Sequence, residues 1–233
     1  MSDNTKKNEL LKQAFKATLP VMAGYLVLGI GFGIVLKVRG YSILWALAMS
    51  VFIYAGSMQF VAIDLLTGGA SLITTALTTL MVNARHLFYG ISMVDKYKEM
   101  GKVKPYLIFS LTDETYSLVC RDEDDPKSRK KYYTAVSVLN HCYWVTGSVL
   151  GAAIGEIIPF SVDGIDFALT ALFVTVFVEQ WVSTKDHVPA LTGVISAVIC
   201  LLIFGSENFL IPTMILITIA LTVLKKIRGK KHE

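Results

Sequence analysis

Apolar residues form long runs along most of this chain, and polar residues gather in short stretches between them. A helix needs roughly 20 mostly apolar residues to cross the hydrocarbon core of a bilayer. The longer runs cover 18–36, 42–66, 70–94, 132–158, 165–183, 188–204 and 209–224. The middle of 42–66, from Tyr54 to Gln59, is small and polar, and the helix is expected to break or admit water there. The pattern predicts an all-α integral membrane protein with about 7–8 transmembrane helices.

One apolar segment, 105–120, is too short to span comfortably and contains Ser110, Asp113 and Glu114. It is either a short tucked helix or a re-entrant segment that lines a cavity. The choice changes the topology. Eight crossings place the tails and the basic loop 121–131 in the cytoplasm but leave the lysines of 95–104 outside, whereas a re-entrant segment keeps that stretch inside. The sequence leaves both alternatives open.

Composition supports the membrane assignment, because 54% of the 233 residues are hydrophobic and 17% are charged. The net charge of +4 comes from lysines and arginines clustered beside the apolar runs, so it does not indicate a nucleic-acid surface. We expect a basic cytoplasmic tail at 1–17, a single transmembrane transport domain at 18–224 and a second basic cytoplasmic tail at 225–233. The first apolar run lacks a signal-peptide cleavage pattern and is predicted to be an anchor. The location expected is the plasma membrane, with several spans.

A weak internal likeness suggests a duplicated architecture. The spacing of Gly29 and Gly33 is repeated by Gly151 and Gly155. The apolar runs that follow carry Gln59 and Gln180 at similar distances along the chain from these glycines. This predicts two related three-helix units joined by the short polar-lined helix at 105–120, as in many secondary transporters. Glycine patterns also recur by chance in membrane helices.

The middle of the run 70–94 carries Asn83, Arg85 and His86. An arginine at the bilayer centre costs at least ~2.5–3.5 kcal/mol on insertion scales, so Arg85 must face the protein interior, a water-filled cavity or a carboxylate. One interpretation is a structural ion pair. The other is a transport site, which the coincidence of three polar groups at one depth favours.

Asp113 and Glu114 form a second polar group. Adjacent residues on a helix diverge by about 100°, so the two carboxylates cannot face the same point. One is expected to pair with Arg85, and the other to meet a substrate or carry a proton; alternatively, both lie in water at the membrane edge. The predicted substrate-binding residues are Arg85, Asn83, Asp113 and Gln59, and the predicted proton-coupling residues are His86, Glu114 and Glu179.

Other chemistries find little support in the sequence. No nucleophile–base pair indicates hydrolysis, and no phosphate-binding loop indicates an ATPase, so an enzyme is not expected. The three cysteines lack metal-ligand spacing, and no metal or cofactor is predicted.

Two stretches resemble the signature motifs of the AzlC family: NARHLFYG at 83–90 and SLTDETYSL at 110–118. The stretch AGSMQF at 55–60 fits as well, and the likeness covers most of the chain from Thr18. The resemblance implies the large subunit of a two-component exporter of branched-chain amino acids, paired with a small AzlD-type membrane subunit. Valine, leucine and isoleucine are the expected substrates, with methionine as a further candidate. Arg85 would bind the substrate carboxylate by a bidentate fork, and Asp113 or Glu114 would bind its ammonium group.

Two other classes of function remain open. One is a channel or carrier for another small solute or anion; the other is a membrane scaffold subunit that does not transport. Polar groups in or near the spans (Asp64, Glu156, Glu179 and Gln180) and glycine-rich faces need partners. Either a small subunit covers them, because lipid cannot form their hydrogen bonds, or the faces pack on one another.

Overall fold

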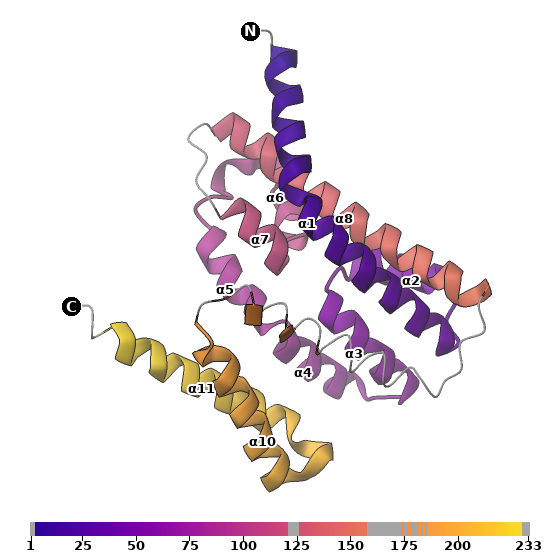
Figure 1. Ribbon diagram of the computed structural model, residues 1–233, viewed down its shortest axis with the longest axis vertical. Coiled ribbons are helices and arrows are strands. Elements are labelled where there is room, and N and C mark those ends of the chain that lie inside the picture. Colours follow the sequence, from indigo (N-terminus) through magenta and orange to yellow (C-terminus); the bar gives the residue numbers. More distant parts are fainter. Residues whose placement is uncertain are drawn as a thin grey trace. The chain divides into compact units, whose positions relative to one another are not determined.

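The computed structural model describes residues 3–120, 126–157 and 186–229, with isolated residues between 174 and 184. Every regular element in these ranges is a helix, which confirms the all-α prediction (Figure 1). The chain divides into two compact units, Met1–Asp166 and Phe167–Glu233. Each is described by itself.

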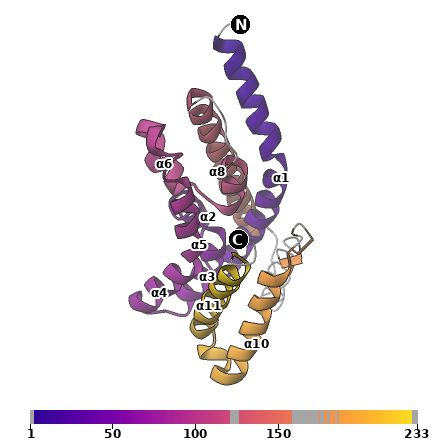
Figure 2. The ribbon, with the colours of Figure 1, turned by 90° about the vertical axis from the view of Figure 1, so that its left-hand side faces the viewer.

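Two long helices, α1 (Asp3–Val38) and α8 (Pro126–Ile157), form the frame of the first unit (Figures 1 and 2). They pack along their length and run in the same direction, since early residues of α1 meet early residues of α8 and Lys37 pairs with Glu156 at 3.5 Å. Helix α1 continues through Pro20, so most of the predicted basic tail and the first apolar run form one helix.

The contact between α1 and α8 is a seam of glycines. A Cβ atom on Gly29 would lie 3.0 Å from the backbone nitrogen of Ser148, and one on Gly33 would overlap the Ser148 carbonyl oxygen. Gly151 of α8 is equally close to Ile30 of α1. Small residues let helix backbones touch in this way. The helix faces that carry Gly29, Gly33 and Gly151 therefore pack on one another, as one of the two predicted alternatives has it.

The apolar run 42–66 forms a hairpin of two short helices, α2 (Ile43–Phe52) and α3 (Gly56–Thr67). The predicted interruption in this run is confirmed. Both outer ends of the hairpin lie near the C-terminal end of α1, because α2 follows it after a short turn and Asp64 pairs with Arg39 at 3.7 Å. The hairpin tip lies against the middle of α8, where a Cβ on Gly56 would meet the Trp144 ring at 3.0 Å.

The run 70–94 is not the single helix that its composition predicts. Helix α4 (Leu72–Val82) ends at Asn83, and α5 (Ala84–Met93) begins immediately after it. Asn83 has φ −93° and ψ 4°, outside helical geometry. Asparagine competes with helical hydrogen bonding through its own amide and favours helix ends, which accounts for an interruption at this residue.

The segment 105–120 also folds as a hairpin. After a 3₁₀ helix, η1 (Lys98–Val103), helix α6 (Lys104–Phe109) reaches a turn, and α7 (Asp113–Val119) comes back. The outer ends of α6 and α7 lie beside the start of α8, in a cluster with Met100, Leu107, Val119, Tyr132 and Tyr133. The segment is therefore a pair of short helices joined by a turn, and its predicted re-entrant position in the membrane stays a prediction.

The second unit contains α10 (Val188–Asn208) and α11 (Leu210–Gly229), which pack on each other. Residues Asn8–Val38 of α1 and Val188–Gly205 of α10 are long and apolar enough to cross a membrane. Most of the run 165–183, including Glu179 and Gln180, lies outside the described residues. The number of spans and the duplication into three-helix units stay predictions.

Candidate functional site

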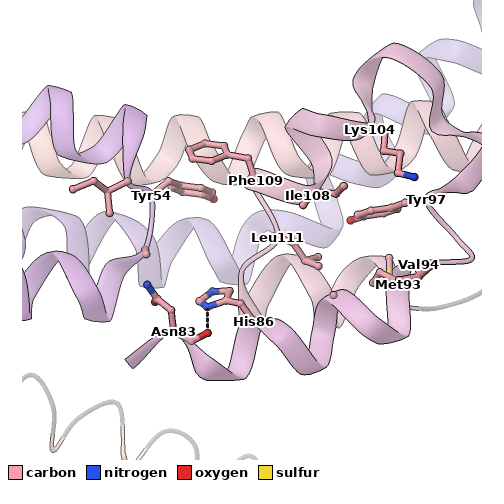
Figure 3. A pocket seen from close by; sticks show the side chains of 13 residues that line it. Tyr54, Asn83, His86, Met93, Val94, Tyr97, Lys104, Ile108, Phe109 and Leu111 are labelled. Carbon is pink, nitrogen blue, oxygen red and sulfur yellow. Dashed lines mark hydrogen bonds between the residues drawn. The ribbon is translucent and has the colours of Figure 1, made fainter. Parts of the chain in front are cut away.

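The breaks in the three interrupted segments surround one cavity of about 560 Å³ (Figure 3). The α2–α3 tip, the α4–α5 break and the α6–α7 turn each contribute residues to its wall. The lining residues are Ile53, Tyr54, Ala55, Asn83, His86, Gly90, Met93, Val94, Tyr97, Lys104, Ile108, Phe109 and Leu111. The wall is mostly apolar, with a few polar groups.

At the first break, Tyr54 has φ 45°, a left-handed conformation that is strained for a bulky residue. Its ring packs on His141 with centroids 4.2 Å apart. The side chain is 4% exposed, so the ring is held inside the protein. Ala55, the residue that precedes α3, offers no side chain to cap the helix.

At the second break, Asn83 and His86 both face the cavity (Figure 3). The Nδ1 atom of His86 lies 3.2 Å from the carbonyl oxygen of Asn83. The side-chain oxygen of Asn83 is buried and accepts no hydrogen bond from the described residues. Arg85 is the second residue of α5, directly after this break, but its side chain lies outside the described part of the structure. Its predicted role stays a prediction.

At the third break, the ring centroid of Phe109 lies 6.2 Å from the ring centroid of Tyr54, so the two hairpin tips meet. His141 of α8 joins the hairpins by hydrogen bonds. Its Nε2 lies 3.2 Å from the Ser50 carbonyl, and its Nδ1 lies 3.2 Å from the Tyr106 hydroxyl. Because a carbonyl only accepts, Nε2 carries the proton, and in the neutral ring Nδ1 accepts from Tyr106.

The predicted carboxylates, Asp113 and Glu114, lie in the first turn of α7, directly after this third break. Tyr25 of α1 donates a hydrogen bond to Glu114 Oε2 at 2.7 Å, and its hydroxyl lies 2.7 Å from Thr112 Oγ1. Asn140 of α8 donates to Thr115 at 3.0 Å. Neither Glu114 nor Asp113 belongs to the cavity lining. The network fixes the start of α7 to the α1–α8 frame.

Gln59 also lies away from the cavity lining. It is fully buried, accepts a hydrogen bond from the Trp144 indole at 2.8 Å and donates to the Ser50 hydroxyl at 3.3 Å. These bonds tie α2, α3 and α8 together, which is a structural role.

The structure thus brings Asn83 and His86 to one site and places Gln59, Asp113 and Glu114 outside its lining; Glu179 is outside the described residues. Sequence reasoning missed Tyr54, Tyr97 and Lys104. Tyr54 begins the small polar stretch that signalled a break, whereas Lys104 was grouped with a basic membrane flank. Within the described ranges, no cluster of His, Cys, Asp and Glu could hold a metal ion.

Comparison with known proteins gives a consistent result. The family described as "AzlC protein" matches residues 20–158. The chain is 45% identical to the "Branched-chain amino acid transport protein AzlC" of Bacillus subtilis over 92% of this chain and 85% of that protein. It is 42% identical to an "Uncharacterized membrane protein" of Haemophilus influenzae, over 92% of this chain and 89% of that one. It is 28% identical to the Escherichia coli "Inner membrane protein YgaZ", over 86% of this chain and 83% of that one.

No solved structure matches the chain. The family match covers more than half of the residues, the relatives are named transport or membrane proteins, and the described residues form apolar helices. The chain is therefore a membrane protein that belongs to the AzlC family.

Proposed function

We propose that this protein exports branched-chain amino acids across the plasma membrane through the cavity at the three helix breaks. One observation carries the proposal: interrupted helices from three segments converge on a single, mostly apolar cavity. Irregular backbone at membrane depth is tolerated where it lines a cavity, and many secondary transporters bind substrate between such half-helices. The name of the Bacillus subtilis relative supports the substrate class.

The cavity suits a small zwitterion with an apolar side chain. Arg85 lies on α5 at the second break and would bind the carboxylate. The C-terminal ends of α2 and α4 and the side-chain oxygen of Asn83 are acceptors for the ammonium group. Residues such as Ile53 and Leu111 would contact the side chain. A methylene group discriminates by only ~1–3 kcal/mol, so valine, leucine, isoleucine and methionine should share the site.

The hairpins also suggest a membrane topology. Helices α2 and α3 have 10 and 12 residues, so each is about half of the ~30 Å hydrocarbon core in length. We infer that α2–α3 enters from the side where α1 ends and that α6–α7 enters from the opposite side, where α8 begins. The basic stretches before α6, at the start of α8 and at the start of α1 then share one side, which the positive-inside rule assigns to the cytoplasm. The C-terminal tail is predicted to lie there as well.

Two further features complete the proposal. Proton entry would drive export, with Glu114, His86 or Glu179 as the carrier, since coupling requires a group whose protonation differs between the two membrane faces. A small AzlD-type subunit would cover apolar helix faces that this chain leaves exposed, such as that of α4, which has no buried residue within the described structure. Two of the four polar groups first considered for such a partner have partners in this chain: Asp64 pairs with Arg39 and Glu156 with Lys37.

The test is uptake of radiolabelled valine into inverted membrane vesicles, in which export appears as uptake. Vesicles should contain this chain alone, the small subunit alone or both, with and without a pH gradient at fixed membrane potential. We expect saturable uptake with both chains and its loss when the pH gradient collapses. Uptake that ignores the gradient would exclude proton coupling. Transport of an anion but not of valine would favour the alternative carrier or channel, and full transport by the small subunit alone would favour a scaffold role for this chain.

A further inference from the structure

We propose that Tyr97 and Lys104 form a second binding subsite, which receives the carboxylate of the amino acid before it reaches the helix breaks. The inference rests on the proposed function and adds a place and a chemistry to it. It arises from the arrangement of polar groups along the cavity wall, which fall at two separate ends.

Figure 3 shows this arrangement. Tyr54, Asn83 and His86 lie at one end of the cavity, and Tyr97 and Lys104 lie at the other. The side chains of Ile108 and Leu111 lie between them. A ligand that enters past Lys104 therefore crosses an apolar middle before it meets the groups at the breaks.

Tyr97 provides the first donor of the subsite. Its side chain is 2% exposed, and its hydroxyl has no hydrogen-bond partner among the described residues. In Figure 3 this hydroxyl points into the cavity, toward its centre. A buried hydroxyl without a partner is unfavourable by about 1–3 kcal/mol, so a ligand that accepts its hydrogen bond would be stabilised there.

Lys104 provides the second donor and the charge. Its side chain is half-buried. Among the described residues that line the cavity, Lys104 is the one lysine or arginine, and no aspartate or glutamate is present to pair with it. Other lysines nearby are used differently. Lys98 forms an exposed pair with Asp95 at 2.6 Å, and Lys96 donates to the carbonyl of Cys120 at the end of α7. None of the described contacts pairs Lys104 with an acid.

A cation and a hydroxyl donor at the same end of a cavity favour an anionic oxygen ligand, and the apolar wall there favours a ligand with a hydrocarbon part. Met93 and Val94 supply that wall beside Tyr97. A free amino acid offers its carboxylate and side chain in this form. The phosphate of an anionic lipid offers similar chemistry, so the experiment must separate the two.

The experiment measures valine uptake by inverted vesicles that contain the full chain and its small subunit, with variants Lys104→Met, Lys104→Arg and Tyr97→Phe. Lys102→Met is the matched control, because Lys102 is an exposed lysine of the same stretch and is absent from the lining. We expect Lys104→Met to raise the half-saturating valine concentration about tenfold, with a maximal rate within about twofold of wild type. Tyr97→Phe should raise the half-saturating valine concentration about threefold or more. Lys104→Arg and Lys102→Met should leave this concentration nearly unchanged.

Inhibition by valinol, which lacks the carboxylate, provides a second readout. Lys104→Met should leave the inhibition constant of valinol unchanged, because the lost contact involves the carboxylate alone. Equal effects of Lys102→Met and Lys104→Met would overturn the proposal, since general surface charge would then explain both. So would an effect of Lys104→Met that occurs in vesicles reconstituted with phosphatidylglycerol but not in phosphatidylcholine, which would assign the subsite to lipid. If wild-type vesicles fail to take up valine at all, the proposed function fails; if only the Lys104→Met effect is missing, the subsite fails and the function stands.

Discussion

Two regions of the first unit differ in how their helices are built: the α1–α8 seam has continuous helices with glycines at the contact, and the cavity wall has interrupted helices. Along the α1–α8 seam, glycines let two continuous helices approach until Gly33 and Gly151 leave no space for a side chain. Around the cavity, helices stop, and Asn83 and Tyr97 keep buried polar atoms without hydrogen-bond partners in the described structure. At the seam the two helix backbones fill the space between them, whereas part of the cavity wall has unmet hydrogen-bonding capacity.

This difference indicates which region holds the protein together and which binds a ligand. A seam of touching backbones resists sliding, because any added atom must displace main chain. Discontinuous helices cost stability and persist where the surrounding structure holds them in place. The hydrogen bonds of Gln59, His141 and Tyr25 attach the hairpin tips to the frame formed by α1 and α8. We expect mutations in the seam to affect assembly and mutations at the cavity to affect transport.

The largest effect is expected from Gly33→Ala. The new methyl group would overlap the Ser148 carbonyl, and overpacking of this kind costs roughly 1–3 kcal/mol or more. Gly31→Ala is the matched control on the same helix, because no atom lies within 4 Å of a Cβ there. The measurement is the thermal midpoint in mild detergent with the yield of monodisperse protein. Equal midpoints for the two variants would show that the seam is not closely packed.

Arg85→Ala is expected to abolish valine export while the protein still inserts and purifies normally. The reason is the loss of the cation at the second break, where the carboxylate would bind. Arg85→Lys should also export poorly, because an ammonium group cannot reproduce the planar fork. Uptake into inverted vesicles measures both, and uptake at wild-type rate by the lysine variant would exclude the carboxylate clamp.

A moderate effect is expected from Tyr25→Phe. This change removes the hydrogen bond to Glu114, so the charged carboxylate loses a stabilising donor. If Glu114 carries the proton, the pH dependence of transport by this variant should differ from that of wild type. Tyr143→Phe is the control, because the Tyr143 hydroxyl interacts with Thr18 at 3.3 Å across the same two helices, away from Glu114. An identical pH profile for wild type and both variants would remove Glu114 from the coupling mechanism.

The smallest effect is expected from Glu156→Gln, which breaks the ion pair with Lys37 at the end of the seam. The side chain of Lys37 is 26% exposed and that of Glu156 is 54% exposed, so water and salt screen their attraction. The loss of stability should be no more than about 0.5 kcal/mol. Thermal unfolding of this variant, compared with Gly33→Ala, measures how much of the seam depends on packing rather than on charge. A loss as large as that of Gly33→Ala would reverse this conclusion.

The sequence by itself determined the class of the protein, because long apolar runs with basic flanks admit little besides membrane helices. It also located the interruption in 42–66 from a small polar stretch, and it singled out Asn83 and His86, which the structure places in the wall of one cavity. Local composition carries these signals. The same local composition predicted a continuous helix over 70–94, since one asparagine hardly changes the hydropathy of a long run.

Only the tertiary structure decided how these pieces meet. Whether 105–120 spans or folds back depends on what its ends contact, and those contacts involve Met100 and Tyr133, which lie outside the segment. The structure changes the interpretation of Gln59 and of Lys104 in opposite directions. A buried amide in a polar stretch resembles a ligand-binding group until Trp144 and Ser50 are seen to use it, and a lysine in a basic flank looks like a membrane anchor until the fold places it on the cavity wall. Contacts between residues distant in the chain decide these placements, and residue type alone does not specify them.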